Sequence, residues 1–288
     1  MIMRISEMNM HPNFNMHYEY TKVEDLFSVQ KVVYVGERGR SFTEDCSVED
    51  FVERNFLNWR LRGTFINVSE MRNALLINKD NMSSRYTTSK EHILCFLQFM
   101  YNCLNFLETS FNKQNSDFTL QMMNLGNTYV DALVSNANAL LFKLNADRYF
   151  DEYMQEIVVF YRDEVDDAIV NEHPDIQRSL IEYRQIDYIG NLQRKSEILT
   201  SLFKKFETFR GELKGTSFDK LQSDTGMLLN LARHAPNKND PIAMRFDVLT
   251  DNEKEIWYDK AYKMFIACLS VLPYIDMKAD VEQLKNSQ

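Results

Sequence analysis

The sequence predicts a mainly α-helical protein: a multi-helix bundle of antiparallel helices, with a less regular N-terminal segment that holds a short strand. Two observations favour this class. Glycine and proline, which interrupt helices, occur only 8 and 5 times in 288 residues, whereas average usage is roughly 7% and 5%. Apolar residues also recur at spacings of three and four through most of the chain, which is the period of one helix face.

The N-terminal part is the least helical. The run KVVYV at 31–35 is β-branched and aromatic, and the turn-like GERG follows it, so we expect a short strand there. Ser47 and Asp50 have the spacing of a capping box, which predicts a helix from Ser47 to about Arg62. This helix should bury some or all of its large apolar residues, Phe51, Phe56, Leu57 and Trp59.

A polar stretch at 78–89 indicates a loop or a joint between domains. We therefore expect an N-terminal segment or small subdomain at 1–80 and a helical domain at 81–288. Three helices should open the helical domain. They are expected at 88–111, at 118–145 and from Asp147 to about Asn171, the last ending before Pro174.

The C-terminal half repeats this pattern. We expect helices at 175–189, at 198–213, where Lys214 and Gly215 close the helix, and at 218–235. Thr250 and Glu253 have capping-box spacing and predict the start of a last helix. Pro273 should end that helix, because proline lacks the N–H that a helix interior requires.

Composition and motifs restrict the function. A net charge of −9 gives no general attraction to nucleic acid, so RNA binding would need a local basic patch. The four cysteines form no Cys-x-x-Cys pair, the start lacks a signal-like apolar run, and we expect a cytoplasmic protein with reduced thiols. No apolar run approaches roughly 18 residues, so no membrane span is expected. Phosphate-loop, dinucleotide, serine-hydrolase and zinc-protease motifs are absent from the sequence.

One short stretch, LLNLARHAPNKND at 228–240, has two interpretations. Arg233 and His234 are adjacent near the expected end of a helix, two residues before Pro236. Cations there interact favourably with the free carbonyl groups, by about 0.3 to 1 kcal/mol, so their role is structural in the first interpretation. In the second, they belong to an RNA-cutting site.

The second interpretation comes from a resemblance. The segment DYIGNLQRKSEILTSLFKKFETFRGELK at 187–214, followed by LLNLARHAPNKN, resembles the last part of HEPN-type helical proteins, a superfamily that includes bacterial abortive-infection and toxin proteins. The similarity covers residues 183–270. It implies a homodimer that cuts RNA without a metal, in phage defence or a toxin system.

The resemblance assigns roles to Asn230, Arg233 and His234, and Asn237 also matches the pattern. His234 would transfer a proton, and Arg233 would stabilise the charge that develops on the phosphate. The sequence departs from the family at one point: no histidine lies four to six residues beyond Arg233, and Lys238 stands there instead. A HEPN-like module without catalysis fits the same residues.

A basic segment precedes this stretch. We expect its cations, together with Lys238, to contact RNA phosphates. The residues assigned to this role are Arg194, Lys195, Lys204, Lys205 and Lys238. Glu197, Glu207 and Glu212 interleave with them, a pattern that also fits an ordinary charged helix face.

Other candidate sites are less complete. Arg85 and His92 have a spacing that fits a catalytic pair. One candidate is a magnesium site, because three carboxylates lie on one helix face and Mg²⁺ prefers oxygen ligands. Another is a zinc site, of which three further residues resemble one half. The carboxylates are Asp163, Asp166 and Asp167, and the zinc candidates are His92, Cys95 and Cys103. We expect neither a metal nor another cofactor.

A second functional hypothesis needs no chemistry. The acidic charge and the lack of a complete motif also fit a non-catalytic helical interaction or scaffold protein. That hypothesis predicts a protein partner and one exposed apolar patch on the surface.

Overall fold

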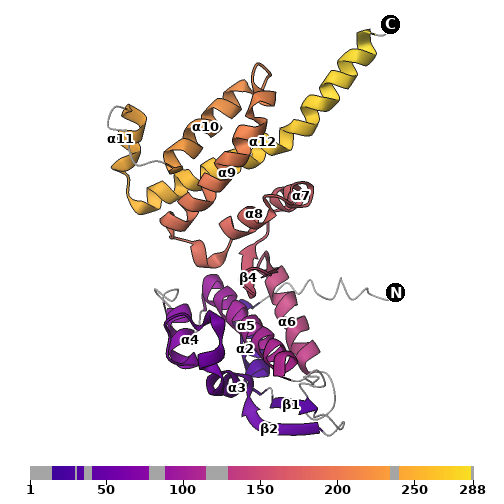
Figure 1. Cartoon of the computed structure of the whole chain (residues 1–288), viewed down its shortest axis with the longest axis vertical. Helices are drawn as coiled ribbons and strands as arrows, with labels where there is room; N and C mark the ends of the chain where they lie inside the picture. The colour runs from indigo at the N-terminus through magenta and orange to yellow at the C-terminus, as the bar shows by residue number, and fades with distance from the viewer. Residues whose placement is uncertain are drawn as a thin grey trace. The chain divides into compact units, whose positions relative to one another are not determined.

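The computed structural model describes residues 15–29, 31–35, 41–77, 88–114, 129–233 and 240–286 (Figure 1). The fold is mainly α-helical, which confirms the predicted class. The chain divides into two compact units, unit 1 at 1–159 and unit 2 at 160–288.

Among the described residues, unit 1 holds helices α2 to α6 and most of the strands. Its elements are α2 (Met16–Ser28), β1 (Lys31–Val35), β2 (Ser41–Ser47), α3 (Val48–Arg54), the 3-10 turns Phe56–Asn58 and Arg60–Arg62, α4 (Val68–Ile77), α5 (Lys90–Gln114), α6 (Tyr129–Lys143), β3 (Ala146–Asp151) and β4 (Glu156–Tyr161). The last two residues of β4 belong to unit 2.

Helix α5 is central to unit 1, since it contacts α2, α3 and α4. Ile93, Leu94, Phe96 and Leu97 on α5 are fully buried. Residues before and after position 80 therefore share one hydrophobic core within unit 1, which extends to residue 159. The expected boundary at residue 80 stays a prediction.

The expected strand at 31–35 is confirmed as β1, which pairs antiparallel with β2 in the register Tyr34 with Phe42. Ser47 and Asp50 form the predicted capping box: the Asp50 N–H donates to Ser47 Oγ, and the Ser47 N–H donates to Asp50 Oδ2. The helix is shorter than predicted, because α3 ends at Arg54 and two 3-10 turns continue to Arg62. Phe51, Phe56 and Trp59 are buried as expected, whereas Leu57 is exposed.

The prediction of one helix from Asp147 to about Asn171 is wrong. Strands β3 and β4 form a two-stranded sheet, and only α7 at 164–172 is helical. Gln155, inside the expected range, has a positive φ angle of 56°, which the interior of a right-handed helix does not permit. The side chain of Asp151 accepts from the N–H groups of Tyr153 and Met154, and these bonds close the turn between the strands.

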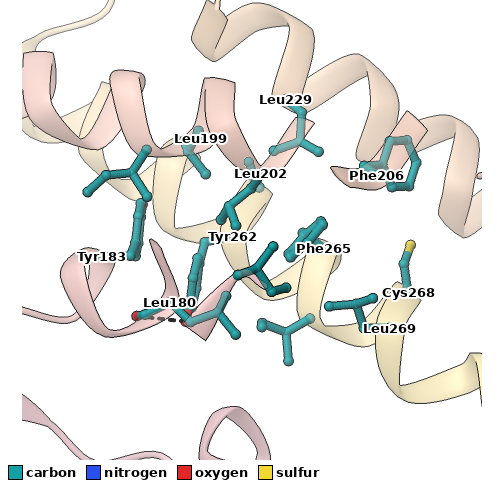
Figure 2. Close-up of a cluster of buried hydrophobic side chains, with 14 of the residues drawn as sticks. Leu180, Tyr183, Leu199, Leu202, Phe206, Leu229, Tyr262, Phe265, Cys268 and Leu269 are labelled. Atoms are coloured by element: carbon teal, nitrogen blue, oxygen red, sulfur yellow. Dashed lines mark hydrogen bonds between the residues drawn. The ribbon is translucent and has the colours of Figure 1, made fainter. Parts of the chain in front are cut away.

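Unit 2 is a helical bundle. Its elements are α7 (Glu164–Glu172), α8 (Gln177–Tyr183), the 3-10 turn Ile186–Tyr188, α9 (Leu192–Leu213), α10 (Asp219–Arg233), α11 (Pro241–Asp247) and α12 (Asp251–Asn286). Helices α9, α10 and α12 contact one another and enclose a core that includes Leu202, Phe206, Leu229, Phe265 and Leu269 (Figure 2).

The helices predicted at 198–213 and 218–235 correspond to α9 and α10, and the one expected at 175–189 is divided into α8 and a 3-10 turn. Gly215, with φ +76°, follows the end of α9. Thr250 and Glu253 form the predicted cap of α12. None of the described helices has both the length and the apolarity that crossing a bilayer requires.

Pro273 does not end the last helix, which continues to Asn286. Proline fixes φ near the helical value and removes only one N–H donor, so a helix survives it when packing holds both sides. Leu272 and Ile275 pack against the core on either side of Pro273, and the Tyr274 ring meets Phe218 edge to face.

Candidate functional site

The C-terminal end of α10 carries part of the site that the resemblance implies. Asn230 and Arg233 are exposed, and three residues of spacing place them on one helix face. The guanidinium of Arg233 lies 5.1 Å from the centre of the Phe203 ring. The described residues do not include His234, Asn237 or Lys238. The structure therefore does not test whether Arg233 and His234 form a catalytic pair.

Most of the cations assigned to RNA contacts are paired with carboxylates. Arg194 donates to both oxygens of Glu182, at 3.1 and 3.0 Å, and to Glu197 at 2.8 Å. Lys205 lies 2.8 Å from Asp175. Lys204 is exposed.

Lys195 is buried rather than exposed, with 5% of its surface accessible. Its Nζ lies 2.8 Å from Glu255 Oε1 and 2.9 Å from Asp259 Oδ1. Burial opposes ionisation of Glu255, but hydrogen bonds from Lys195 and the Gly190 N–H outweigh it and lower the pKa of this carboxyl. The ion pairs connect α9 to α12 and leave this cation no access to a phosphate.

A pair of stacked tyrosines lies beside Lys195, and no local sequence pattern indicates it. The rings of Tyr183 and Tyr262 are 4.2 Å apart and nearly parallel (Figure 2). Tyr262 donates to Asp166 Oδ2 at 2.7 Å, and Tyr183 donates to Asp259 Oδ1 at 2.9 Å. Burial raises the pKa of both hydroxyls above the ordinary tyrosine value of 10.0, so both stay protonated at neutral pH.

Arg184 completes this buried network. Its Nη1 donates to Asp167 at 2.8 Å, its Nε lies 3.6 Å from Asp166, and its guanidinium faces the Phe160 ring. Its Nη2 is buried without an acceptor in the described part of the chain. Burial raises the pKa of Asp166, although Tyr262 and Arg184 act in the opposite direction. The network joins α7 and α8 to α12, which is a structural role.

The metal candidates are occupied by other contacts or buried. Asp163 caps α7 by accepting from the Val165 N–H, and Asp166 and Asp167 pair with Arg184. Cys95 and Cys103 are buried thiols on α5. Across the residues that the structure describes, no group of three or more His, Cys, Asp or Glu side chains is placed to hold a metal ion. Arg85 lies outside those residues, so its pairing with His92 is untested.

The C-terminal part of α12 carries an exposed apolar face. Within unit 2, this part of the helix extends past α9 and α10 (Figure 1). The exposed residues are Tyr274 (51% exposed), Met277 (57%), Val281 (47%) and Leu284 (73%), which we call the α12 stripe. Their spacing of three, four and three residues places them along one side of the helix. Lys278, Asp280 and Lys285 flank the stripe and are also exposed.

Comparison with known proteins identifies no relative: no family model, no curated protein and no solved structure matches this chain.

Proposed function

We propose that this chain is a non-catalytic helical interaction protein that binds a protein partner through the α12 stripe. The exposed apolar side chains of the α12 stripe are the observation that supports this proposal. Four large apolar side chains on one side of a helix are costly to leave in water, and contiguous exposed apolar surface of this kind is typical of protein-binding sites.

Two features of the polar residues support an interaction role over catalysis. Arg194, Lys195 and Lys205, three of the five cations assigned to RNA contacts, already have carboxylate partners in the chain. The buried hydroxyls of Tyr183 and Tyr262 are held protonated and donate to carboxylates. These groups stabilise the bundle, whereas the α12 stripe contributes little to its core.

Site-specific photo-crosslinking in the cells of origin tests the proposal. A benzoylphenylalanine at position 277 should give a covalent adduct with a protein, because Met277 lies within the stripe. The same probe at position 283, on the other side of α12, is the matched control and should give none. Adding Val281→Glu should abolish the adduct from position 277, since a charge in the stripe opposes burial. Equal adducts from both positions, or none from either, would contradict an interaction through this face.

RNA-directed activity of the HEPN type is a second candidate function. It is favoured by one observation, that Asn230 and Arg233 are both exposed on one face of α10. Under this proposal the chain cuts RNA in phage defence or a toxin system, and His234 transfers the proton. Total RNA incubated with the wild-type protein should be cleaved, and Arg233→Ala or His234→Ala should stop cleavage. Lys220→Ala, an exposed cation on the same helix, is the control. Equal cleavage by all variants, or none by the wild type, would remove this candidate.

A further inference from the structure

We infer that the partner of the α12 stripe is a second copy of this chain, aligned parallel to the first in a short two-stranded coiled coil. This inference rests on the proposed function and specifies its partner. The spacing of the stripe matches two heptads, whose seven positions are named a to g and whose a and d residues form the seam. Tyr274 and Val281 take position a, and Met277 and Leu284 take position d.

The types of side chain in the stripe favour a dimer of two parallel helices. In parallel dimers, a β-branched residue at a and a leucine at d pack well in the seam between two helices. Val281 and Leu284 provide this combination in the second heptad. Tyr274 and Met277 fill the first heptad, where α12 leaves the bundle and Tyr274 already packs against Phe218.

The flanking charges also favour the parallel arrangement. Asp280 takes position g and Lys285 takes position e of the next heptad, and parallel helices bring these two positions together across the seam. A symmetric dimer would therefore make two ion pairs between Asp280 and Lys285 of the second copy. An antiparallel dimer would instead place Lys278 beside Lys285 of the second copy, and these like charges repel.

The geometry of α12 leaves the seam accessible without disturbing the core. At about 100° per residue, Val281 lies roughly 160° around the helix from Phe265, which is fully buried against α9 and α10. The stripe is about 15 Å long, so the dimer should be weak and concentration-dependent. Because α12 is already helical, association does not have to order this segment.

Light scattering after size-exclusion chromatography, over a range of loading concentrations, tests the dimer. The wild-type chain should shift from monomer to dimer as its concentration rises. Val281→Glu combined with Leu284→Glu should weaken dimerisation roughly 100-fold, because two apolar side chains lose their burial. Gln283→Glu adds a charge outside the seam and should dimerise like the wild type. Circular dichroism should show unchanged helicity in both variants, since all three positions are exposed.

Charge exchange tests the orientation. Asp280→Lys or Lys285→Glu alone should weaken a parallel dimer by roughly threefold to tenfold at low salt, and the double exchange should restore it. In an antiparallel dimer, Lys285→Glu alone would strengthen association, because it would face Lys278.

The outcomes separate the inference from the proposed function. A wild-type monomer at every concentration up to ~1 mM, a trimer or tetramer, or a dimer that the stripe variants leave unchanged would each overturn the parallel dimer. If the probe at position 277 then gives an adduct with a different protein, the interaction function stands and only its partner is wrong. If position 277 gives no adduct either, both fail.

Discussion

Lys195 illustrates, at the scale of single residues, how burial changes what a cation does. The sequence predicts an RNA contact for Lys195, yet its ammonium group lies between Glu255 and Asp259. We predict that Lys195→Met destabilises the fold by about 2 to 4 kcal/mol, because it leaves two carboxylates without their counter-charge; Asp259 is half-exposed, so solvent compensates part of the loss. Urea denaturation measures this change.

Lys204 is the matched control for Lys195, since both lie on α9. Lys204 is exposed, so Lys204→Ala should change the free energy of unfolding by less than about 0.5 kcal/mol. Equal effects of the two substitutions would contradict the structural role assigned to Lys195.

Asp166 makes stability depend on pH in a defined direction. Burial raises the pKa of this carboxyl above its ordinary value of 3.8. The folded state therefore binds the proton more tightly than the unfolded state, so protonation stabilises the fold, and this contribution is lost as the pH rises through the folded pKa. Asp166→Asn removes the titration and keeps an acceptor for Tyr262. We predict that the difference in unfolding free energy shifts in favour of the wild type as the pH falls from neutrality.

Denaturation of both proteins across the acidic range measures this difference. Glu255, whose pKa is lowered, is present in both proteins, so its opposite pH dependence cancels. A difference that stays constant with pH would contradict a raised pKa at Asp166.

How much of the candidate site could be predicted depends on the separation of its partners. Arg194 and Glu197 lie one helical turn apart, so their pairing is visible in the sequence. Glu182, which also binds Arg194, and Asp259, which binds Lys195, come from α8 and α12. Pairings between elements depend on the packing of the bundle, and local spacing carries no signal for them.

At the scale of elements, α5 satisfies the backbone of β4 with two amide side chains one turn apart. The Val159 N–H donates to Gln98 Oε1 at 2.7 Å. Asn102 binds both polar groups of Ile157: its Oδ1 accepts from the N–H at 2.8 Å, and its Nδ2 donates to the carbonyl at 2.7 Å. The two side chains therefore take the place of a neighbouring strand along this part of β4.

We predict that Asn102→Leu destabilises the protein by about 2 to 3 kcal/mol, because it leaves an N–H and a carbonyl in a half-buried position without partners. The control is Asn105→Ala. Asn105 makes one long, exposed bond of 3.4 Å to the Gln155 carbonyl, so its loss should cost less than about 0.5 kcal/mol. Thermal denaturation of the two variants measures both effects, and a neutral Asn102→Leu would show that these amides do not hold β4.

Strand β4 shows why some elements cannot be predicted from the local sequence. Helices α9 and α10 repeat apolar residues over many turns, so their period identifies them. The run EIVVFY in β4 is short and apolar, and such runs do not distinguish a strand from a buried helix. Its hydrogen-bond partners on α5 lie more than 50 residues earlier, outside any local pattern.

Pro273 allows a test of the last turns of α12. In a helix interior, proline is less favourable than alanine by about 3 kcal/mol. Pro273→Ala should therefore slow amide hydrogen exchange at 274–286 by up to about 100-fold, because local opening becomes more costly. Lys278→Ala, in which both residues are good helix formers, should change exchange little. Unchanged exchange in Pro273→Ala would mean that packing alone sets the stability of this segment.

At the scale of the whole molecule, the two units draw on separate sets of residues. The core of unit 2 lies between Ile169 and Leu269. Strand β4 is the covalent link: Val159 is held by Gln98 in unit 1, whereas the Tyr161 N–H donates to the Arg184 carbonyl in unit 2. The boundary therefore falls inside a strand, where no loop-like composition marks it in the sequence.

We predict that residues 160–288 fold alone, because they retain their whole core and the bonds of Phe160 and Tyr161 to the segment after α8. Far-UV circular dichroism should show a helical protein that unfolds in one cooperative transition. A chain of residues 81–288 is the comparison. It separates α5 from α2, α3 and α4 and exposes Phe96 and Leu97, which are fully buried in the intact chain. That chain should aggregate or unfold without cooperativity. If it folds cooperatively while 160–288 does not, the division at residue 80 is the correct one.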